Sequence, residues 1–298
     1  MRILDKEFGI RQLGEVGLMD GGLAILQKNI QRSHGMILVT GPTGSGKTTT
    51  LYAVLGKLMG PEVNVITLED PVEYRIESIN QSQVHADIGY TFAAGLRSVV
   101  RQDPDIVMLG EIRDRETADM AIHAALTGHI VLSTLHTNDS AGAFPRLIDM
   151  GIEPFLITSS IHTVVAQRLV RILDPDHRSE RKLTGAELDE VLEEIEKLPE
   201  PTKKMLLEEG IDLKHPTFYE PVVDLANGIK GFKGRMGVFE VLDVTEDIRD
   251  LVAQRSSGDK ITEMAIKQDH MLTMLQDGLV KAMRGMTTLE EVWRVTKE

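Results

Sequence analysis

Residues 41–50 are Gly41-Pro42-Thr43-Gly44-Ser45-Gly46-Lys47-Thr48-Thr49-Thr50, and this stretch decides the fold of the chain. It meets the phosphate-loop pattern G-x-x-x-x-G-K-S/T, in which bare backbone N–H groups and the positive end of a helix face an anion. The alternative is a chance glycine turn, and a random chain of this length would match the pattern on the order of once in a hundred. The stretch therefore predicts a nucleotide site, with contacts from Gly41, Pro42, Thr43, Gly44, Ser45, Gly46, Lys47, Thr48 and Thr49.

The segments on either side of the loop support this prediction. Residues 36–40 are a short apolar run rich in branched side chains, typical of a strand buried on both faces of a parallel sheet. Residues 48–58 have helical length and no proline, so the glycines are expected at a strand-to-helix turn. There Lys47 would reach the outer phosphates, and the Thr48 hydroxyl would hold a magnesium ion that bridges them.

Composition limits the classes of function. The chain has 298 residues, enough for about two domains, and its formal net charge of −13 argues against a nucleic-acid partner, which usually requires a basic surface. The absence of cysteine excludes disulfides and thiolate metal sites and fits a reducing compartment. No apolar run reaches the roughly 18 residues of a membrane span, and no signal-peptide pattern is present. A cytoplasmic protein without membrane insertion is expected.

Acidic residues follow the next predicted strand. Residues 64–68 are apolar and run directly into Glu69-Asp70-Pro71-Val72-Glu73. The carboxyl ends of strands line the ligand crevice in doubly wound sheets, so these acids are placed to orient water or a metal. Because Asp-Pro is also common in turns, a solvated turn is the alternative.

Two further strands end in polar residues. Residues 105–111 are an apolar strand ending in Glu111, a Walker B pattern whose acid holds magnesium through water or polarises the attacking water. The strand over residues 129–136 is bracketed by His129 and His136, and a sensor for a terminal phosphate would lie at its carboxyl end. Lone histidines are more often structural, and we adopt that interpretation for His123 and His162.

A pair of arginines lies on a predicted helix over residues 91–101. Arg97 and Arg101 are four residues apart, so they share one face of this helix. Paired arginines suit phosphate oxygens. An exposed solubilising surface is the alternative, and the residues alone favour it. Further helices are predicted over residues 20–30 and 116–126.

Together these motifs resemble the secretion ATPase superfamily, and most closely its assembly motors of type IV pili and type II secretion. The similarity extends from about Arg2 to the C-terminus. In chain order, the Walker A motif, Asp box, arginine segment, Walker B motif and the two parts of the His box correspond to residues 41–48, Glu69-Asp70-Pro71-Val72-Glu73-Tyr74, residues 96–105, Gly110-Glu111-Ile112-Arg113-Asp114, Thr127-Gly128-His129 and Thr134-Leu135-His136-Thr137.

The resemblance implies a role for each matched residue. Glu73 corresponds to the catalytic acid of the Asp box, Glu111 to the Walker B acid and magnesium ligand, and His129 with His136 to the His-box pair. Arg2 matches an arginine at the end of a preceding domain. The implied cofactors are ATP and Mg²⁺. Family arginines that approach nucleotide phosphates, in part across subunits, correspond to Arg97, Arg101 and Arg235.

The later part of the chain is less regular in pattern. Residues 144–171 show helix-like apolar spacing and end in a stretch also similar to the family. Residues 183–209 are rich in Glu, Lys and Leu, with a capping box that starts at Thr184 and helix breaks at Pro199 and Pro201. Residues 231–242 then return to the core with glycines that suggest tight turns, and the remainder is predicted to be helical.

The resemblance also bears on metal binding. Many members of the superfamily carry two C-x-x-C pairs on zinc in a small insert at this place in the chain. Here those positions are occupied by Asp174, His177, Asp224 and Asn227. Such a set is a poor tetrahedral zinc site, because thiolate supplies much of the affinity in structural sites. We expect no zinc.

The fold expected from these features is α/β, a RecA-like P-loop NTPase core with a small acidic helical insert and a helical C-terminal subdomain. The chain would divide into four parts. Residues 1–18 would be a linker or the remnant of a preceding domain, 19–172 the ATPase core, 173–230 the insert, and 231–298 the return to the core with the C-terminal helices.

The expected function is a cytoplasmic ATPase motor that powers type IV pilus assembly or type II secretion, peripheral to the inner membrane. Its expected partners are five further copies in a homohexamer and an inner-membrane platform protein. A pilus-retraction motor is the nearest alternative, although the acidic insert favours the assembly branch. A RecA-like nucleic-acid motor and a nucleotide-binding scaffold without turnover are the other classes considered. The net charge of −13 argues against a nucleic-acid motor, and the acids Glu73 and Glu111 argue against a scaffold without turnover.

Overall fold

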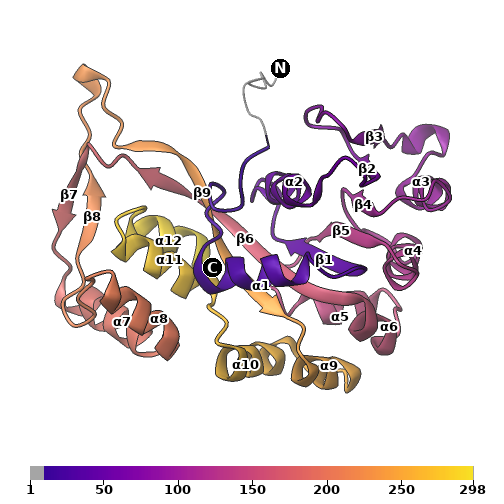
Figure 1. The fold of residues 1–298 in the computed structure, drawn as a ribbon. Coiled ribbons are helices and arrows are strands. Elements are labelled where there is room, and N and C mark those ends of the chain that lie inside the picture. Colours follow the sequence, from indigo (N-terminus) through magenta and orange to yellow (C-terminus); the bar gives the residue numbers. More distant parts are fainter. Residues whose placement is uncertain (1–9, 298) are drawn as a thin grey trace.

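The computed structural model describes residues 10–297, and within them seven strands form one sheet in the order β3-β2-β4-β5-β1-β6-β9 (Figure 1). Neighbouring strands run parallel except β9, which runs antiparallel to β6. The strands are β1 (Gly35–Thr40), β2 (Val65–Glu69), β3 (Asn80–Gln83), β4 (Ile106–Leu109), β5 (Ile130–Leu135), β6 (Ile161–Leu173) and β9 (Phe232–Asp243). The phosphate loop therefore leaves the sheet between β5 and β6.

The central strand β1 shows that the sheet is buried on both faces. Side chains alternate along a strand, so Met36 and Leu38 join the hydrophobic core on one face while Ile37 and Val39 join the core on the other. All four side chains are at most 2% exposed. A strand covered on both faces has no polar side, which explains the continuous apolar run in the sequence.

Helices cover both faces of the sheet. On the Ile37 face lie α1 (Asp20–Asn29) and α2 (Lys47–Leu58). On the Met36 face lie α3 (Phe92–Val99), α4 (Arg115–Leu126), α5 (Ala143–Asp149), α6 (Pro154–Ser160), α9 (Glu246–Ala253) and α10 (Gly258–Asp269). The predicted strands and helices between residues 20 and 136 are confirmed, with boundaries that shift by one to a few residues.

The helix-like prediction for residues 144–171 was wrong over its second half. Two short helices, α5 and α6, are followed by β6, a strand of 13 residues that pairs with both β1 and β9. The first seven residues of β6 are all buried, and a continuously apolar segment has no periodicity that separates a buried strand from a buried helix. Branched side chains at Ile161, Thr163, Val164 and Val165 favour the strand.

The acidic insert consists of a hairpin and two helices. Strands β7 (Arg178–Arg181) and β8 (Phe218–Pro221) pair with each other, and α7 (Gly185–Glu196) and α8 (Glu200–Glu208) lie between them in the chain. The predicted capping box is confirmed, because Thr184 and Glu187 cap α7 reciprocally. The predicted break at Pro199 is confirmed, since α7 ends before it and α8 starts after it. The break predicted at Pro201 is wrong, because this proline lies in the first turn of α8, where its missing N–H has no partner to lose. The proposed four-part division of the chain stays a prediction.

The C-terminal helices α11 (Met274–Met283) and α12 (Leu289–Thr296) pack between the insert and the sheet (Figure 1). Thr288 caps α12, since its hydroxyl accepts from the Glu291 N–H at 3.2 Å. Helix α11 is joined to β9 by a buried ion pair. The Lys281 ammonium, only 1% exposed, donates to Asp277 at 2.5 Å and to the Gly237 carbonyl at 2.9 Å.

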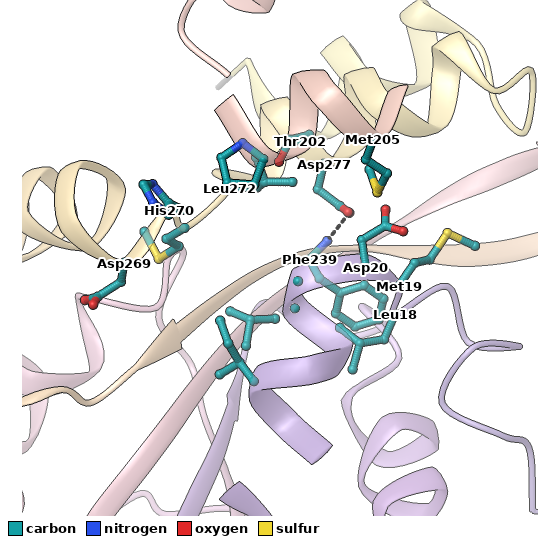
Figure 2. Close-up of a pocket in the computed structure, with 16 residues that line it drawn as sticks. Leu18, Met19, Asp20, Thr202, Met205, Phe239, Asp269, His270, Leu272 and Asp277 are labelled. Carbon is teal, nitrogen blue, oxygen red and sulfur yellow. Dashed lines mark hydrogen bonds between the residues drawn. The ribbon is translucent and has the colours of Figure 1, made fainter. Parts of the chain in front are cut away.

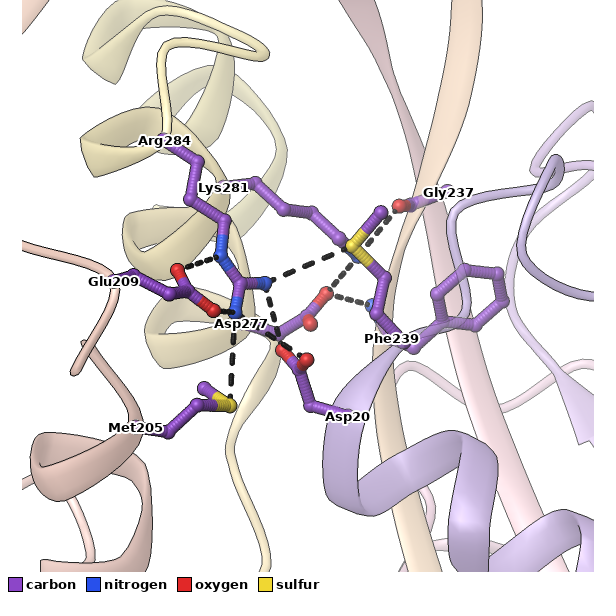
Figure 3. Close-up of polar contacts among 9 residues, drawn as sticks. Asp20, Met205, Glu209, Gly237, Phe239, Asp277, Lys281 and Arg284 are labelled. Carbon is purple, nitrogen blue, oxygen red and sulfur yellow. Dashed lines mark hydrogen bonds and ion pairs between the residues drawn. The ribbon is translucent and has the colours of Figure 1, made fainter.

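A second ionic contact joins three segments that are far apart in the sequence. The Arg284 guanidinium of α11 donates to Asp20 of α1 and to Glu209 just after α8, each at 2.7 Å (Figure 3). Beside this contact lies a cavity of about 300 Å³ between α1, β9 and α8 (Figure 2). Within residues 10–297, no helix combines the length and apolarity needed to cross a membrane.

His162 is a buried structural histidine, as interpreted from the sequence. Its ring is 8% exposed and lies against Gly35, where an added Cβ would come within 2.2 Å of it. In the tautomer with hydrogen on Nε2, the ring donates to the His34 carbonyl at 3.1 Å. Burial and the nearby Arg32 guanidinium lower the pKa of His162 to about 4. The folded protein therefore excludes the imidazolium form at pH values where the unfolded chain accepts it.

This shift predicts a pH-dependent stability. An unfolded-state histidine titrates near pH 6.5, so the free energy of unfolding should fall as the pH drops from about 6.5 towards 4. His162→Gln should weaken that dependence, as measured by urea denaturation at pH 7 and pH 5. His85→Gln, which removes an exposed histidine, serves as control and should behave like the parent chain. Equal pH dependence in His162→Gln and the parent would contradict the assignment.

Candidate active site

The phosphate loop wraps the carboxyl end of β1 and presses against β6. Gly41 has φ +139° and Gly46 has φ +90°, values that side-chain-bearing residues rarely adopt. A Cβ on Gly41 would lie 2.5 Å from the Gln167 carbonyl oxygen, and one on Gly46 would lie 2.8 Å from the Gln167 side-chain nitrogen. Glycine is therefore required at both positions by backbone conformation and by the closeness of β6.

Lys47 lies over the loop. Its ammonium donates to the carbonyls of Gly41 at 2.8 Å and Pro42 at 3.0 Å. Burial lowers the pKa of Lys47, and the nearby Glu111 carboxylate acts in the opposite direction. Thr48 and Thr49 follow in the first turn of α2, both half-buried, while Thr43 and Gly44 are exposed at the tip of the loop. The loop thus presents a half-buried cation beside the start of a helix, which suits a phosphate group.

Gln167 lies on β6 and supports the phosphate loop. No functional role was predicted for this residue from the sequence. The side chain is 1% exposed, and its carbonyl oxygen accepts from the Thr50 hydroxyl at 2.7 Å. This bond ties the first turn of α2 to β6. In the sequence, Gln167 stands out only as a polar residue within an otherwise apolar run. Its supporting role can be inferred only once that run is known to form β6 beside the phosphate loop.

Glu111 and His136 meet at the carboxyl edge of the sheet. They follow the neighbouring parallel strands β4 and β5, and His136 Nε2 lies 2.9 Å from a Glu111 carboxylate oxygen. The Glu111 side chain is only 12% exposed, and it also pairs with Arg113. Thr134 holds the two strand ends together by donating its hydroxyl to the Gly110 carbonyl at 2.7 Å. The structure thus brings together Glu111, the predicted Walker B acid, His136 of the predicted His box, and the phosphate loop with Lys47.

In the acidic cluster, two acids have different environments. Glu69 is 2% exposed and accepts hydrogen bonds from Tyr52, from Thr67 at 2.5 Å and from Gln81 at 3.1 Å, so its role is structural. Glu73 is half-buried. Burial raises the pKa of Tyr52, Glu69 adds to this shift, and Glu73 contributes as well, which places Glu73 near α2. Its catalytic role stays a prediction.

The structure does not bring the remaining predicted residues to the loop of the same chain. Helix α3 runs back towards the amino edge of the sheet, where Gln102 and Asp103 accept from Asn64. Arg97 pairs with Glu116 on α4, both more than half exposed. His129 precedes β5, so its strand separates it from His136 by roughly 20 Å. Arg101 is also exposed.

Arg235 is exposed and lies on β9, where it pairs with Arg171 of β6. Arg171 follows Gln167 by four residues along β6. The predicted role of Arg2 falls outside the residues that the structure describes. The roles of Arg97, Arg101, His129 and Arg235 stay predictions. Of these, Arg97, Arg101 and His129 lie towards the amino edge of the sheet, away from Lys47 of the same chain.

The four positions considered for zinc form two internally bonded turns. In the first, His177 Nδ1 lies 3.0 Å from an Asp174 carboxylate oxygen. In the second, Asp224 accepts from the side chain of Asn227 at 2.7 Å and from the backbone N–H of Ala226 at 3.1 Å. Among residues 10–297, no group of three or more His, Asp or Glu side chains is arranged to hold a metal.

Comparison with known proteins supplies the family. A model of the type II/IV secretion system protein family matches residues 1–294. The chain belongs to this family. Type II secretion system protein E of Pseudomonas aeruginosa is 44% identical over 100% of this chain and 56% of its own length. Type IV pilus assembly ATPase PilB of Myxococcus xanthus is 44% identical over 98% of this chain and 49% of its own length.

The chain therefore spans about half the length of these secretion-family relatives. Among solved structures, the pilus retraction motor PilT with bound ADP is similar with a TM-score of 0.68 and 26% identity, over 100% of this chain and 69% of that chain. The Legionella pneumophila ATPase DotB shares the fold, with a TM-score of 0.63 and 22% identity over 96% of this chain and 65% of its own. The expected α/β fold with a P-loop NTPase core is confirmed.

Because β6 supports the phosphate loop through Gln167, loss of this side chain should weaken nucleotide binding. Gln167→Ala removes the bond to Thr50 and the atoms behind Gly46, so the loop should lose its preorganised shape. Nucleotide affinity should fall roughly tenfold, consistent with a lost buried hydrogen bond and added loop freedom. Titration of a fluorescent ADP analogue measures this, with the exposed Gln254→Ala as control. Unchanged affinity in a folded Gln167→Ala protein would rule out the supporting role.

The two turns of the insert lead to a metal prediction. Each turn satisfies its polar side chains internally, so neither needs a cation. Protein purified without added metal should contain no stoichiometric zinc by elemental analysis. One zinc per chain that disappears in His177→Ala would show that the turns do converge on a metal.

Proposed function

We propose that this chain is the motor portion of a secretion or pilus-assembly ATPase and that it hydrolyses ATP with Mg²⁺. One observation carries the proposal. The Glu111 carboxylate, bonded to His136, lies at the carboxyl edge of the sheet, close enough to Lys47 to affect its pKa. A cation for phosphate, an acid at a Walker B position and a histidine on the neighbouring strand form the minimum set for positioning phosphate and water.

The residues at this edge fit a magnesium ion. Mg²⁺ prefers hard oxygen ligands, and the Thr48 hydroxyl together with Glu111, directly or through water, would supply them. When bound, the ion neutralises charge on the outer phosphates. Lys47 would exchange its two carbonyl contacts for phosphate oxygens, and the first turn of α2 would donate backbone N–H groups.

Water activation is assigned to the acids. Glu73 or Glu111 positions the attacking water, and His136 holds the Glu111 carboxylate in one orientation. Glu69 is unsuited to this task, because its oxygens are already occupied by three donors of the chain itself. The phosphate loop and the segments after β2, β4 and β5 then supply the residues that bind phosphate and position water. Only the stabilisation of transition-state charge is left to residues elsewhere.

Similarity favours the assembly branch over retraction. The relatives named for type II secretion and pilus assembly are 44% identical to this chain, whereas PilT is 26% identical. We propose a cytoplasmic location peripheral to the inner membrane and a platform protein of the pilus or secretion machine as partner. The net charge of −13 and the named relatives give no support to a nucleic-acid motor.

A homohexamer is proposed as the working form. Arg97 and Arg101 are exposed and lie away from their own phosphate loop, which suits contribution to a neighbour's site. An interface between unlike surfaces closes into a ring when the rotation per subunit permits. Arginines supplied by a neighbour stabilise transition-state charge only after docking, so turnover would depend on assembly.

The first test removes the phosphate-loop cation. Lys47→Ala should abolish ATP hydrolysis, because no other cation of the loop replaces it on the outer phosphates. Lys57→Ala removes an exposed lysine from the same helix and should leave turnover unchanged. Steady-state phosphate release, with and without DNA, measures both. Full activity in Lys47→Ala, or salt-sensitive stimulation by DNA, would sink the proposal.

The second test addresses the shared site. Specific activity should rise with protein concentration, and Arg97→Ala or Arg101→Ala should lower turnover while nucleotide affinity of the monomer stays nearly intact. Mixing Arg97→Ala with Lys47→Ala protein should restore some activity, because mixed interfaces pair an intact loop with intact arginines. Glu116→Ala is the matched control, since it breaks the Arg97 ion pair within the chain but keeps the arginine. Activity per chain that is independent of concentration, without rescue on mixing, would exclude the shared site.

A further inference from the structure

The loop that carries His136 is held from several directions. This loop, residues 136–140, follows β5 and is called the His136 loop. The Asp139 carbonyl accepts from the Thr40 hydroxyl at 3.2 Å and from the Thr137 hydroxyl at 2.9 Å. Thr40 directly precedes the phosphate loop, so the two loops share this contact. The Asp139 carboxylate accepts from the Gly142 N–H at 2.6 Å, which fixes the start of α5.

The last residue of the His136 loop is held by a glutamate from a distant part of the chain. A carboxylate oxygen of Glu240, on β9, accepts from the Ser140 N–H at 2.9 Å and from the Ser140 hydroxyl at 2.6 Å. Glu240 is 5% exposed and Ser140 is fully buried. In the sheet, Glu240 pairs with Ala166, the residue before Gln167. Ala166 in turn pairs with Thr40, so the glutamate reaches across β6, level with the end of β1, to the loop that positions His136.

Glu240 also contacts the C-terminal helices. Besides the two donors of Ser140, the backbone N–H of Met274, at the start of α11, lies near the carboxylate and acts against the rise in its pKa. The carboxylate therefore joins the His136 loop on one side and the first residue of α11 on the other. Helix α11 in turn packs on α12 and on the insert. A displacement of Ser140 would be passed towards α11 through Glu240 and through Met271, whose sulfur lies 3.9 Å from the Ser140 hydroxyl.

The chemistry of the contact argues for a specific role. In residues 10–297, the interactions of Glu240 are with neutral donors and with the like charge of Asp139, and no cation is among them. Burial raises the pKa of Glu240, and the hydrogen bonds from Ser140 oppose that shift. A buried carboxyl group without a cation is costly, and an apolar side chain would fill the same space more favourably. Stability alone does not account for a glutamate here.

We propose that Glu240 is a positioning residue for ATP hydrolysis, which holds the His136 loop so that His136 orients Glu111 and couples that loop to helix α11. The proposal rests on the proposed ATPase function. Only three residues lie between His136 and Ser140, so a fixed Ser140 limits the positions open to the His136 ring. When the terminal phosphate changes the Glu111–His136 contact, the movement reaches Met274 through Ser140 and Glu240.

The first experiment separates turnover from binding. Glu240→Ala should lower kcat for ATP roughly tenfold or more and change KM less than about threefold, because Glu240 touches no nucleotide. Glu240→Gln should retain most of the activity, since its amide oxygen can accept both Ser140 donors. An unchanged kcat in Glu240→Ala, or an equal loss in Glu240→Gln, would overturn the positioning role.

A double-mutant cycle tests whether Glu240 acts through Ser140. Ser140→Ala removes one of the two donors and should lower kcat by a smaller factor than Glu240→Ala. The double variant should be no worse than Glu240→Ala alone, because the two changes remove one interaction. Independent, multiplying effects on kcat would show that Glu240 does not act through this serine and would overturn the proposal. If Glu240→Ala folds poorly, the cycle can be run with Glu240→Leu, which fills the same space but accepts no hydrogen bond from Ser140.

A matched variant controls for general loss of stability. Glu291 is likewise buried, at 2% exposure, and joins β6 to α12 through Arg171 and Arg294, with no contact to the His136 loop. Glu291→Gln should lower the thermal midpoint and leave kcat near the parent value. If Glu240→Ala and Glu291→Gln lose kcat to a similar extent at matched thermal midpoints, Glu240 has only a structural role. An inactive parent chain would instead refute the proposed function itself.

Discussion

A close approach between two backbone segments is the contact on which the rest of the structure depends. A Cβ on Gly41 would lie 2.5 Å from the Gln167 carbonyl oxygen, so the phosphate loop turns directly against β6. That contact needs glycine in the loop and a buried strand beside β1. Once both are present, the first turn of α2 is fixed by the Thr50 bond to Gln167. The position of Lys47 follows from the same contact.

Parallel pairing then assembles the chemistry. Strands β4, β5 and β1 are adjacent and point the same way, so their carboxyl ends place Glu111, His136 and the phosphate loop along one edge. The same geometry separates other residues. His129 belongs to the amino end of β5, and α3 returns towards that end with Arg97 and Arg101. One strand direction therefore decides which predicted residues can act within a chain and which would need a neighbour.

The antiparallel strand β9 joins this edge to the C-terminal helices. It carries Glu240 towards the His136 loop and presents the backbone of Phe239 and Gly237 to the buried Asp277–Lys281 pair of α11. Ion pairs taken out of water return little net stability, but breaking one leaves an unpaired buried charge. Helix α11 is thus held in one position against β9. Arg284 extends this connection to α1 and the insert (Figure 3).

The sequence by itself determined the local features. The phosphate loop, the strands and helices up to residue 136, the capping box at Thr184 and the family followed from short patterns whose physics acts within a few residues. Only the tertiary structure decided that residues 161–173 form a strand, because uniform burial erases the periodicity that separates strands from helices. Contacts across large sequence separations, such as Ser140 with Glu240 and Thr50 with Gln167, were equally out of reach. A hydrogen bond between residues a hundred positions apart leaves no periodic trace in the chain, since it depends on strand order and direction rather than on local propensity.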